Sequence, residues 1–211
     1  MLLALGISAL AGYLLGSVNF AVLVSKRHGM DILKEGSGNP GATNVKRVLG
    51  KGPGNLVFAL DALKGAAGTY LPFLLADAVS PVAPRFELLA AGFVGTLLGH
   101  CFSCFLNFKG GKGVASTIGG LLVLLPVPIV IGAALWAIAF YTTRYVSVAS
   151  LALGLSLPLS CWLLPKFTPL EFGAAQLIFA SAIALFNVWT HRSNIVRLVR
   201  GEENKFTKKA S

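Results

Sequence analysis

Long apolar runs alternate with short polar segments along the whole chain. Runs long enough to cross a bilayer core, about 20 helical residues, lie at 2–25, 53–76, 86–106, 146–164 and 170–190. A sixth run, 114–143, is interrupted by Leu-Pro-Val-Pro at 125–128, where the prolines remove backbone donors and disfavour a continuous helix. We therefore expect an all-α integral membrane protein.

The distribution of Lys and Arg indicates that the 114–143 run forms two spans. Six basic residues lie in 26–52 and six follow Thr190, and the positive-inside rule places both segments in the cytoplasm. Spans at 114–125 and 127–143 give a seven-transmembrane-helix bundle with an outside N-terminus, and 15 of the 18 basic residues then face the cytoplasm. The sequence thus predicts a single membrane-embedded domain over 1–211, with short interfacial helices on the cytoplasmic side.

Composition excludes most other classes of protein. The chain is 55% hydrophobic and 12% charged, its mean hydropathy is +0.75 and its net charge is +10, so it is too apolar for a soluble domain, a disordered basic tail or a nucleic-acid binder. Three cysteines have neither a disulfide framework nor zinc-ligand spacing. We expect free thiols, and no metal, cofactor or nucleic-acid partner.

The first polar cluster, 35–51, contains the signals of a short helix. Asn39 suits the N-cap, Pro40 the first helical position and Gly50 the position after the end, which predicts a helix over 40–49.

This cluster is also suited to anion binding. The start of the helix, with Ser37, would offer free N–H groups, and Arg47 would hold phosphate oxygens with its forked guanidinium. A glycine-rich turn that serves only membrane topology is an equal alternative.

The second cluster, 107–117, has the composition of an anion-binding loop. Gly110, Gly111 and Gly113 allow consecutive amides to point one way, and Lys112 adds a cation. The segment lacks the first glycine and the Ser or Thr of a Walker loop. A simple glycine-rich hairpin loop is the alternative.

The third cluster, 189–205, predicts an interfacial helix that continues from the last span. His191 and Asn194 are three residues apart and would share a face at its start. A single His at a membrane boundary is more often an interfacial polar residue than a base.

Four polar residues inside the spans have open roles. Asp61 and Lys64 lie three apart, and either an ion pair within the bundle or a substrate contact fits them. The role of His100 is ambiguous, and Ser150 lies at a depth where a substrate hydroxyl or phosphate would be met.

Together the three clusters resemble a known family. SGNPGATNVKRVLG, GHCFSCFLNFKGGKGVAS and HRSNIVRLVRGEENK, in this order between apolar spans, are similar to the three motifs of the bacterial acyl-phosphate:glycerol-3-phosphate acyltransferases, the PlsY family. The resemblance implies a multi-pass enzyme of the bacterial inner membrane whose active site faces the cytoplasm. Such an enzyme transfers a fatty acyl group from acyl phosphate to the 1-hydroxyl of sn-glycerol 3-phosphate without a cofactor, among membrane lipids. Its products are lysophosphatidic acid and inorganic phosphate, in the first step of phospholipid synthesis.

The resemblance also assigns residue roles. The catalytic residues would be Ser37, His191 and Asn194; the substrate-binding residues would be Thr43, Arg47, Gly110, Gly111, Lys112, Gly113 and Ser150; and Glu202 would be a structural acid. Three positions depart from the family's pattern, with Ser103 for a usual proline, Asn107 for a common glycine and Ser116 for a frequent Thr. These departures concern loop geometry rather than the reaction.

Two questions stay open at the level of sequence. Either His191, as a general base, or an oxygen of a substrate phosphate would accept the proton of the attacking hydroxyl. A membrane transporter or binding protein for a phosphate-bearing metabolite is the rival function, since half-helix ends bind anions in such proteins. A CoA-dependent acyltransferase with Asp five residues after its His is disfavoured, because no His here has Asp at that position.

Overall fold

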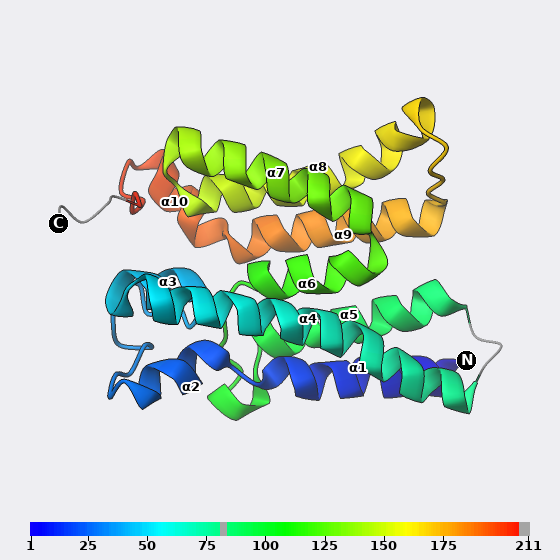
Figure 1. Ribbon diagram of the computed structural model, residues 1–211, viewed down its shortest axis with the longest axis horizontal. Helices are drawn as coiled ribbons and strands as arrows, with labels where there is room; N and C mark the ends of the chain where they lie inside the picture. Colours follow the sequence, from blue (N-terminus) through cyan, green and yellow to red (C-terminus); the bar gives the residue numbers. More distant parts are fainter. Residues whose placement is uncertain (81–83, 207–211) are drawn as a thin grey trace. The chain divides into compact units, whose positions relative to one another are not determined.

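The computed structural model describes residues 1–80 and 84–206, and regular structure in these ranges is helical throughout. The helices form two compact units, Met1–Leu124 and Leu125–Ser211 (Figure 1). The prediction of an all-α fold is confirmed.

The N-terminal unit contains six α-helices and one short 3-10 helix. They are α1 (Leu2–Ser17), α2 (Phe20–Arg27), α3 (Ala42–Leu49), α4 (Lys51–Val79), α5 (Arg85–Cys101), η1 (Cys104–Leu106) and α6 (Val114–Leu124). The helices α1 and α5 touch through backbone, since a Cβ at Gly12 or at Gly16 would overlap backbone atoms of α5. Small residues allow membrane helices to approach this closely.

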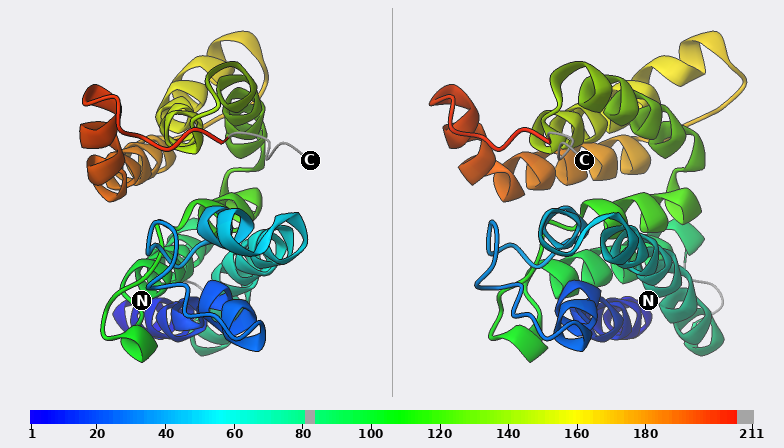
Figure 2. Two further views of the ribbon diagram at one scale, coloured as in Figure 1. Left: turned by 90° about the vertical axis from the view of Figure 1, so that its left-hand side faces the viewer. Right: turned by 60° about the vertical axis from the view of Figure 1, so that its left-hand side comes forward.

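The C-terminal unit contains α7 (Pro126–Thr143), α8 (Val146–Phe167), α9 (Ala174–Thr190) and α10 (Arg192–Val199). The first three pack side by side in the order α7, α8, α9 (Figure 2). Helix α10 bends away from α9 by 57° at His191, so the predicted helix after the last span is present as a separate element.

Four described helical stretches are long and apolar enough to cross a membrane, and a fifth results if α9 and α10 are taken as one bent span. The expected division of 114–143 is confirmed, because α6 ends at Leu124 and α7 begins at Pro126. The 11 residues of α6 fall short of a normal span, as expected. The seven-span count stays a prediction.

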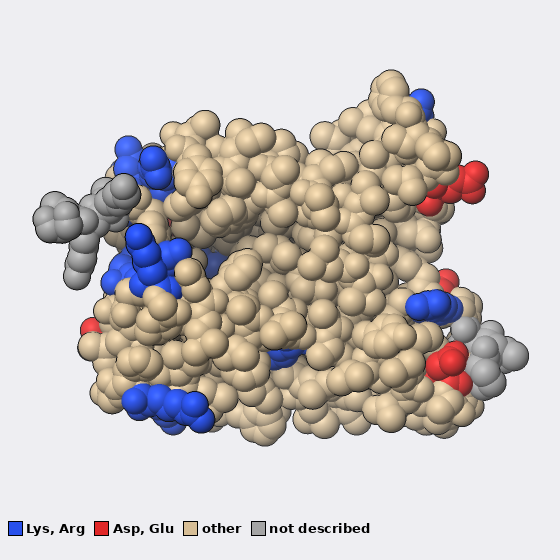
Figure 3. All heavy atoms as spheres, in the orientation of Figure 1, with Lys and Arg blue, Asp and Glu red and all other residues tan. Residues whose placement is uncertain are grey.

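Basic side chains of the N-terminal unit gather mainly at the end that α2 and α3 form (Figure 3). The last turn of α2 carries Lys26 and Arg27, and that of α3 carries Lys46 and Arg47. All four belong to the basic segment 26–52, for which the positive-inside rule predicts a cytoplasmic position.

The first predicted span, 2–25, is broken at Val18 and Asn19. The Asn19 side chain accepts a 3.0 Å hydrogen bond from the Val22 amide and so caps α2. An Asn at this position stabilises the start of a new helix, which is why the apolar run becomes two helices.

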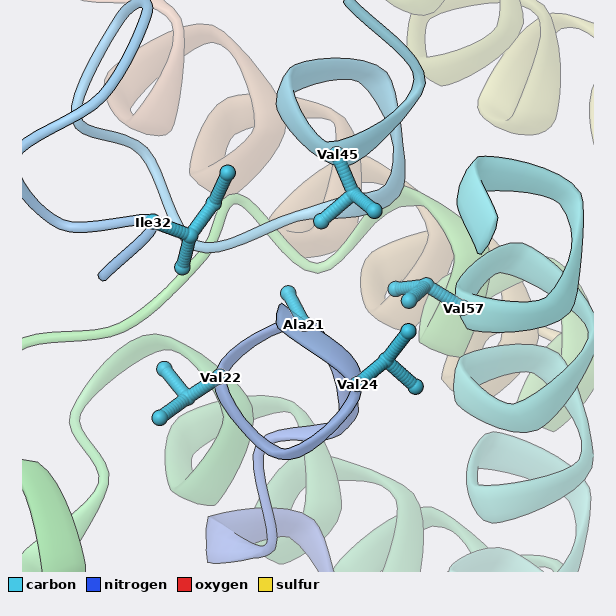
Figure 4. Packing of buried hydrophobic residues seen from close by; sticks show 6 residues of the cluster. All are labelled: Ala21, Val22, Val24, Ile32, Val45 and Val57. Carbon is cyan, nitrogen blue, oxygen red and sulfur yellow. The ribbon is translucent and has the colours of Figure 1, made fainter. Parts of the chain in front are cut away.

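Helix α3 is anchored by a small apolar core. Ala21, Val24, Val45 and Val57, from α2, α3 and α4, face one another there together with Ile32 of the connecting loop (Figure 4). This packing fixes the polar cluster that precedes α3.

The expected start of this helix was wrong. Helix α3 begins at Ala42, and its N-cap is Gly41 instead of Asn39. Pro40 stays outside the helix because its carbonyl oxygen accepts a hydrogen bond from the Asn19 side chain, at 3.3 Å. Gly50 follows the helix end with a φ of +91°, as expected.

Candidate active site

In the N-terminal unit, Asn44 organises the first polar cluster. Its Oδ1 atom accepts hydrogen bonds from the Ser37 amide, at 2.9 Å, and from the Arg47 guanidinium, at 3.3 Å. Its Nδ2 atom donates to the carbonyl oxygens of Ile32, at 3.3 Å, and Glu35, at 2.9 Å. One buried amide therefore satisfies four partners and brings Ser37 and Arg47 together.

The predicted site residues of this cluster surround the Asn44 amide. Ser37 and Arg47 are exposed, and Thr43 is partly buried in the first turn of α3. An exposed guanidinium beside an exposed hydroxyl suits a phosphate group that arrives from water.

The glycine-rich loop leads directly into α6. The Gly111 amide donates to the carbonyl oxygen of His100, at 3.1 Å, and the Gly113 carbonyl accepts the first helical hydrogen bond from Thr117, at 2.7 Å. Gly113 has a φ of +80°, which side chains with a Cβ rarely adopt. Lys112 is partly buried between these glycines.

The loop thus combines a cation, small residues and a helix N-terminus, the arrangement that binds anions in proteins.

Gly111 brings the first two clusters into contact. A Cβ added to Gly111 would lie 3.1 Å from the Pro40 carbonyl oxygen and would overlap the His100 ring nitrogen Nε2. Only a residue without a side chain fits between these two groups. The N-terminal unit therefore holds the segment around Pro40 beside the glycine-rich loop.

Two departures from the family pattern have a structural explanation. Asn107 adopts a φ of +51°, which Asn tolerates better than most residues with side chains. Ser103 is fully buried, donates a 2.6 Å hydrogen bond to the Ser17 carbonyl and caps η1 through the Phe105 amide. Both residues thus support the loop.

In the C-terminal unit, His191 lies at the junction of α9 and α10 and is 3% exposed. Its Nδ1 atom lies 2.9 Å from the carbonyl oxygen of Asn187. Because a carbonyl can only accept, Nδ1 carries a proton, and Nε2 is the basic nitrogen of the neutral ring.

Asn194 is oriented by Glu203. The Asn194 Nδ2 atom donates to Glu203 Oε1 at 2.6 Å, and Arg197 Nε donates to Glu203 Oε2 at 2.8 Å. Glu202, which we predicted as the structural acid, has an exposed side chain. The contacts expected of a structural acid are made by Glu203.

The electrostatics of Glu203 favour its charged form. Burial raises the pKa of Glu203, but hydrogen bonds from Asn194 and Arg197, with contributions from the Ser147 hydroxyl and the Arg197 charge, outweigh burial and hold the pKa below its ordinary value. A carboxylate held in this way fixes its donors in place.

Ser150 is fully buried. Its hydroxyl donates to the Val146 carbonyl at 2.8 Å and accepts a 3.4 Å hydrogen bond from Trp136. Its carbonyl oxygen accepts the Asn187 side chain at 2.9 Å. Asn187 of α9 therefore connects Ser150 of α8 to His191 at the junction of α9 and α10.

Within the N-terminal unit, the segment around Pro40 lies beside the glycine-rich loop. Within the C-terminal unit, the predicted residues Ser150 and His191 are linked through Asn187, whereas the predicted Glu202 is exposed. Sequence reasoning missed three residues that organise them, Asn44, Asn187 and Glu203. An Asn within an apolar helix was the available signal for Asn187, and Asn44 falls in a motif that was recognised.

Comparison with known proteins agrees with these features. The profile of a family described as glycerol-3-phosphate acyltransferase matches residues 6–201. A glycerol-3-phosphate acyltransferase of Shouchella clausii is 39% identical over 212 residues, which cover 99% of each chain. One of Desulfotalea psychrophila is 41% identical over 204 residues, 95% of this chain and 97% of that protein.

Solved structures show the same similarity. The crystal structure of PlsY, an integral membrane glycerol 3-phosphate acyltransferase, in its glycerol 3-phosphate form has a TM-score of 0.81 and 37% identity, and covers 97% of this chain and 96% of that one. The lysophosphatidic acid form has a TM-score of 0.79 at the same identity and covers 97% and 95% of the two chains. The chain is therefore an integral membrane protein that belongs to the glycerol-3-phosphate acyltransferase family.

Proposed function

We propose that the protein transfers a fatty acyl group from acyl phosphate to the 1-hydroxyl of sn-glycerol 3-phosphate. The products are lysophosphatidic acid and inorganic phosphate. The observation that carries this proposal is that the N-terminal unit holds two features side by side, the Ser37–Arg47 cluster and the glycine-rich loop, whose cations and backbone amides are suited to phosphate groups. Two phosphate-bearing substrates need two such features.

The N-terminal unit supplies the phosphate contacts in this proposal. Arg47, with Ser37 and Thr43 beside it, binds one phosphate group. Lys112 and the amides of Gly110, Gly111 and Gly113 bind the other. Cations and fixed amide dipoles also stabilise the charge that develops on the leaving phosphate and on the carbonyl oxygen.

The C-terminal unit orients the acceptor substrate. His191 Nε2 accepts a hydrogen bond from a glycerol hydroxyl, and the Asn194 amide, held by Glu203, contacts the same substrate. Ser150 supports this region through its link to Asn187. The Ser150 hydroxyl is already hydrogen-bonded to Val146 and Trp136 within the unit. We therefore assign Ser150 a supporting role rather than a direct contact with the substrate.

The proposed reaction requires little from the protein beyond alignment of the two substrates. The 1-hydroxyl oxygen attacks the acyl carbon, the new ester C–O bond forms, and the bond between that carbon and the phosphate oxygen breaks. The phosphate leaves with the electron pair of the broken bond. The hydroxyl proton passes to His191 Nε2 or to an oxygen of the substrate phosphate.

Donor choice provides the test of the proposed function. Purified protein in detergent, mixed with glycerol 3-phosphate and palmitoyl phosphate, should release inorganic phosphate and lysophosphatidate in equal amounts. Palmitoyl-CoA should give no product. Turnover only with palmitoyl-CoA, or no turnover with either donor, contradicts the proposal. Uptake of a phosphate compound into sealed vesicles without product would indicate a transporter.

A His191→Ala variant identifies the proton acceptor. Loss of most turnover together with loss of the acidic limb of the rate profile against pH assigns the proton to His191. Substantial turnover with an unchanged pH profile assigns it to the substrate phosphate.

We also propose seven spans in the bacterial inner membrane, with the basic segments 26–52 and 192–205 facing the cytoplasm. The charge distribution supports this topology. Single cysteines introduced at exposed Lys34 and Arg200 should react with a membrane-impermeant maleimide in inverted vesicles and not in intact cells.

A further inference from the structure

A buried polar cluster of the N-terminal unit lies outside the residues assigned above. It consists of Asp61 and Lys64 on α4 and His100 on α5, whose side chains are 3–4% exposed. Lys64 Nζ lies 3.1 Å from Asp61 Oδ1 and 3.0 Å from His100 Nδ1. The ion pair reduces the cost of burying two charges in a membrane protein. It does not account for the further contacts of Lys64 and His100.

The first of these contacts leads to the Pro40 segment. The Lys64 ammonium donates to the carbonyl oxygen of Val18, at 2.7 Å, at the break between α1 and α2. The next residue, Asn19, caps α2 and donates to the carbonyl oxygen of Pro40. Lys64 therefore holds the backbone from which Asn19 reaches the first motif.

The second contact leads to the glycine-rich loop. Because an ammonium can only donate, His100 Nδ1 accepts from Lys64, and Nε2 carries the proton of the neutral ring. The Nε2 side of the ring packs against Gly111, where a Cβ would overlap it. The His100 carbonyl also accepts the Gly111 amide, at 3.1 Å.

His100 also contacts the far side of the loop. Ser116 Oγ, in the first turn of α6, lies 3.3 Å from His100 Nδ1. One imidazole therefore contacts both the loop and the helix that the loop begins.

We propose that Asp61, Lys64 and His100 are positioning residues that align the Pro40 segment and the glycine-rich loop for phosphate binding. Asp61 holds the Lys64 ammonium, Lys64 fixes the break at Val18 and the orientation of His100, and His100 supports Gly111. The inference deepens the proposed function and rests on it, because that function assigns a substrate phosphate to the loop. A purely structural ion pair within α4, between Asp61 and Lys64, is the alternative.

Two single variants test the positioning roles of His100 and Lys64. His100→Asn keeps an acceptor near the position of Nδ1 but removes the part of the ring that contacts Gly111. Lys64→Met keeps most of the side-chain volume and removes the ammonium. We expect either variant to raise KM for at least one phosphate substrate tenfold or more, and to lower kcat by a smaller factor.

A matched control measures loss of stability alone. Ser8 on α1 donates a buried 2.7 Å hydrogen bond to the Leu88 carbonyl of α5, and it contacts none of the proposed site residues. Ser8→Ala should lower the thermal unfolding midpoint in detergent and leave both KM values within twofold of the wild type.

The double variant Asp61→Asn/Lys64→Met tests the ion-pair alternative. It removes both buried charges, so it should unfold at a higher temperature than Lys64→Met, in which Asp61 has lost its partner. Its KM should stay raised, because the contacts to Val18 and His100 are still missing. Recovery of wild-type KM in the double variant would overturn the positioning role.

Hydrogen–deuterium exchange in the substrate-free protein gives a readout independent of turnover. Amides of Gly110–Gly113 should exchange faster in His100→Asn and Lys64→Met than in the wild type or in Ser8→Ala. This pattern in a protein that does not use acyl phosphate would refute the proposed function and leave the positioning role intact. Unchanged exchange and unchanged KM in both single variants would overturn the positioning role.

Discussion

The carboxylate of Glu203 holds the side-chain amide of Asn194 by a 2.6 Å hydrogen bond across the turn that ends α10. The other carboxylate oxygen accepts from Arg197, so one acidic side chain fixes two neighbours. With Oε1 and Oε2 both engaged, the Asn194 amide has a defined orientation. A residue that is to orient a substrate needs such support.

Replacement of Glu203 should therefore impair activity through Asn194. Glu203→Gln keeps one acceptor oxygen but turns an NH2 group toward one of two donors, so one of the two hydrogen bonds is lost. We expect kcat/KM to fall about tenfold, equivalent to about 1.4 kcal/mol. Glu202→Gln, at the exposed neighbouring position, should stay within twofold, and equal losses in the two variants would contradict this role of Glu203.

The same carboxylate makes stability depend on pH. Because the folded protein holds the pKa of Glu203 below its ordinary value of 4.5, this group stabilises the fold above that value, and the stabilisation is lost as pH falls through the lowered pKa. Thermal unfolding of the wild type and Glu203→Gln should therefore differ most near pH 7. The difference should shrink toward pH 3, and a difference constant over this range would refute the assignment.

Asn44 should be critical for the first motif. Asn44→Ala removes the partner of the Ile32 and Glu35 carbonyls and of the Ser37 amide. The hydrogen bond to Ile32 is buried, and a buried group that stays unpaired costs about 1–3 kcal/mol. We expect lower thermal stability and at least a tenfold loss of kcat/KM. The exposed Asn55, which accepts a hydrogen bond from Lys46, provides the control, since Asn55→Ala should change neither quantity appreciably.

Sequence patterns predicted the helices better than their ends. Apolar run length located the long helices, and two prolines located the break before α7. The break at Asn19 was missed because one Asn within an apolar run changes the hydropathy little, although it caps a new helix once the chain is folded. Asn39 was expected to cap α3, but Asn19 binds the Pro40 carbonyl and keeps Pro40 outside the helix.

The motifs located the candidate site residues but not the residues that hold them in place. Glu202 and Glu203 are adjacent residues of the same type, so the sequence alone does not distinguish their roles. Gly201, with a φ of +71°, turns the chain after α10, so helical spacing no longer predicts which acid reaches Asn194. The contact of His100 with Gly111 joins the end of α5 to the loop before α6, so the periodicity of a single helix does not predict it.

The space at Gly111 provides the most direct test of the loop geometry. Gly111→Ala would place a Cβ against His100 Nε2 and 3.1 Å from the Pro40 carbonyl, so the loop must move from both neighbours. We expect KM for the phosphate substrate bound by the loop to rise at least tenfold. Gly52→Ala, where nothing lies within 4 Å, introduces the same methyl group near the start of α4 and should be neutral or stabilise the fold by up to about 1 kcal/mol. Wild-type kinetics in Gly111→Ala would mean that the loop binds phosphate without the close packing of Gly111 on His100.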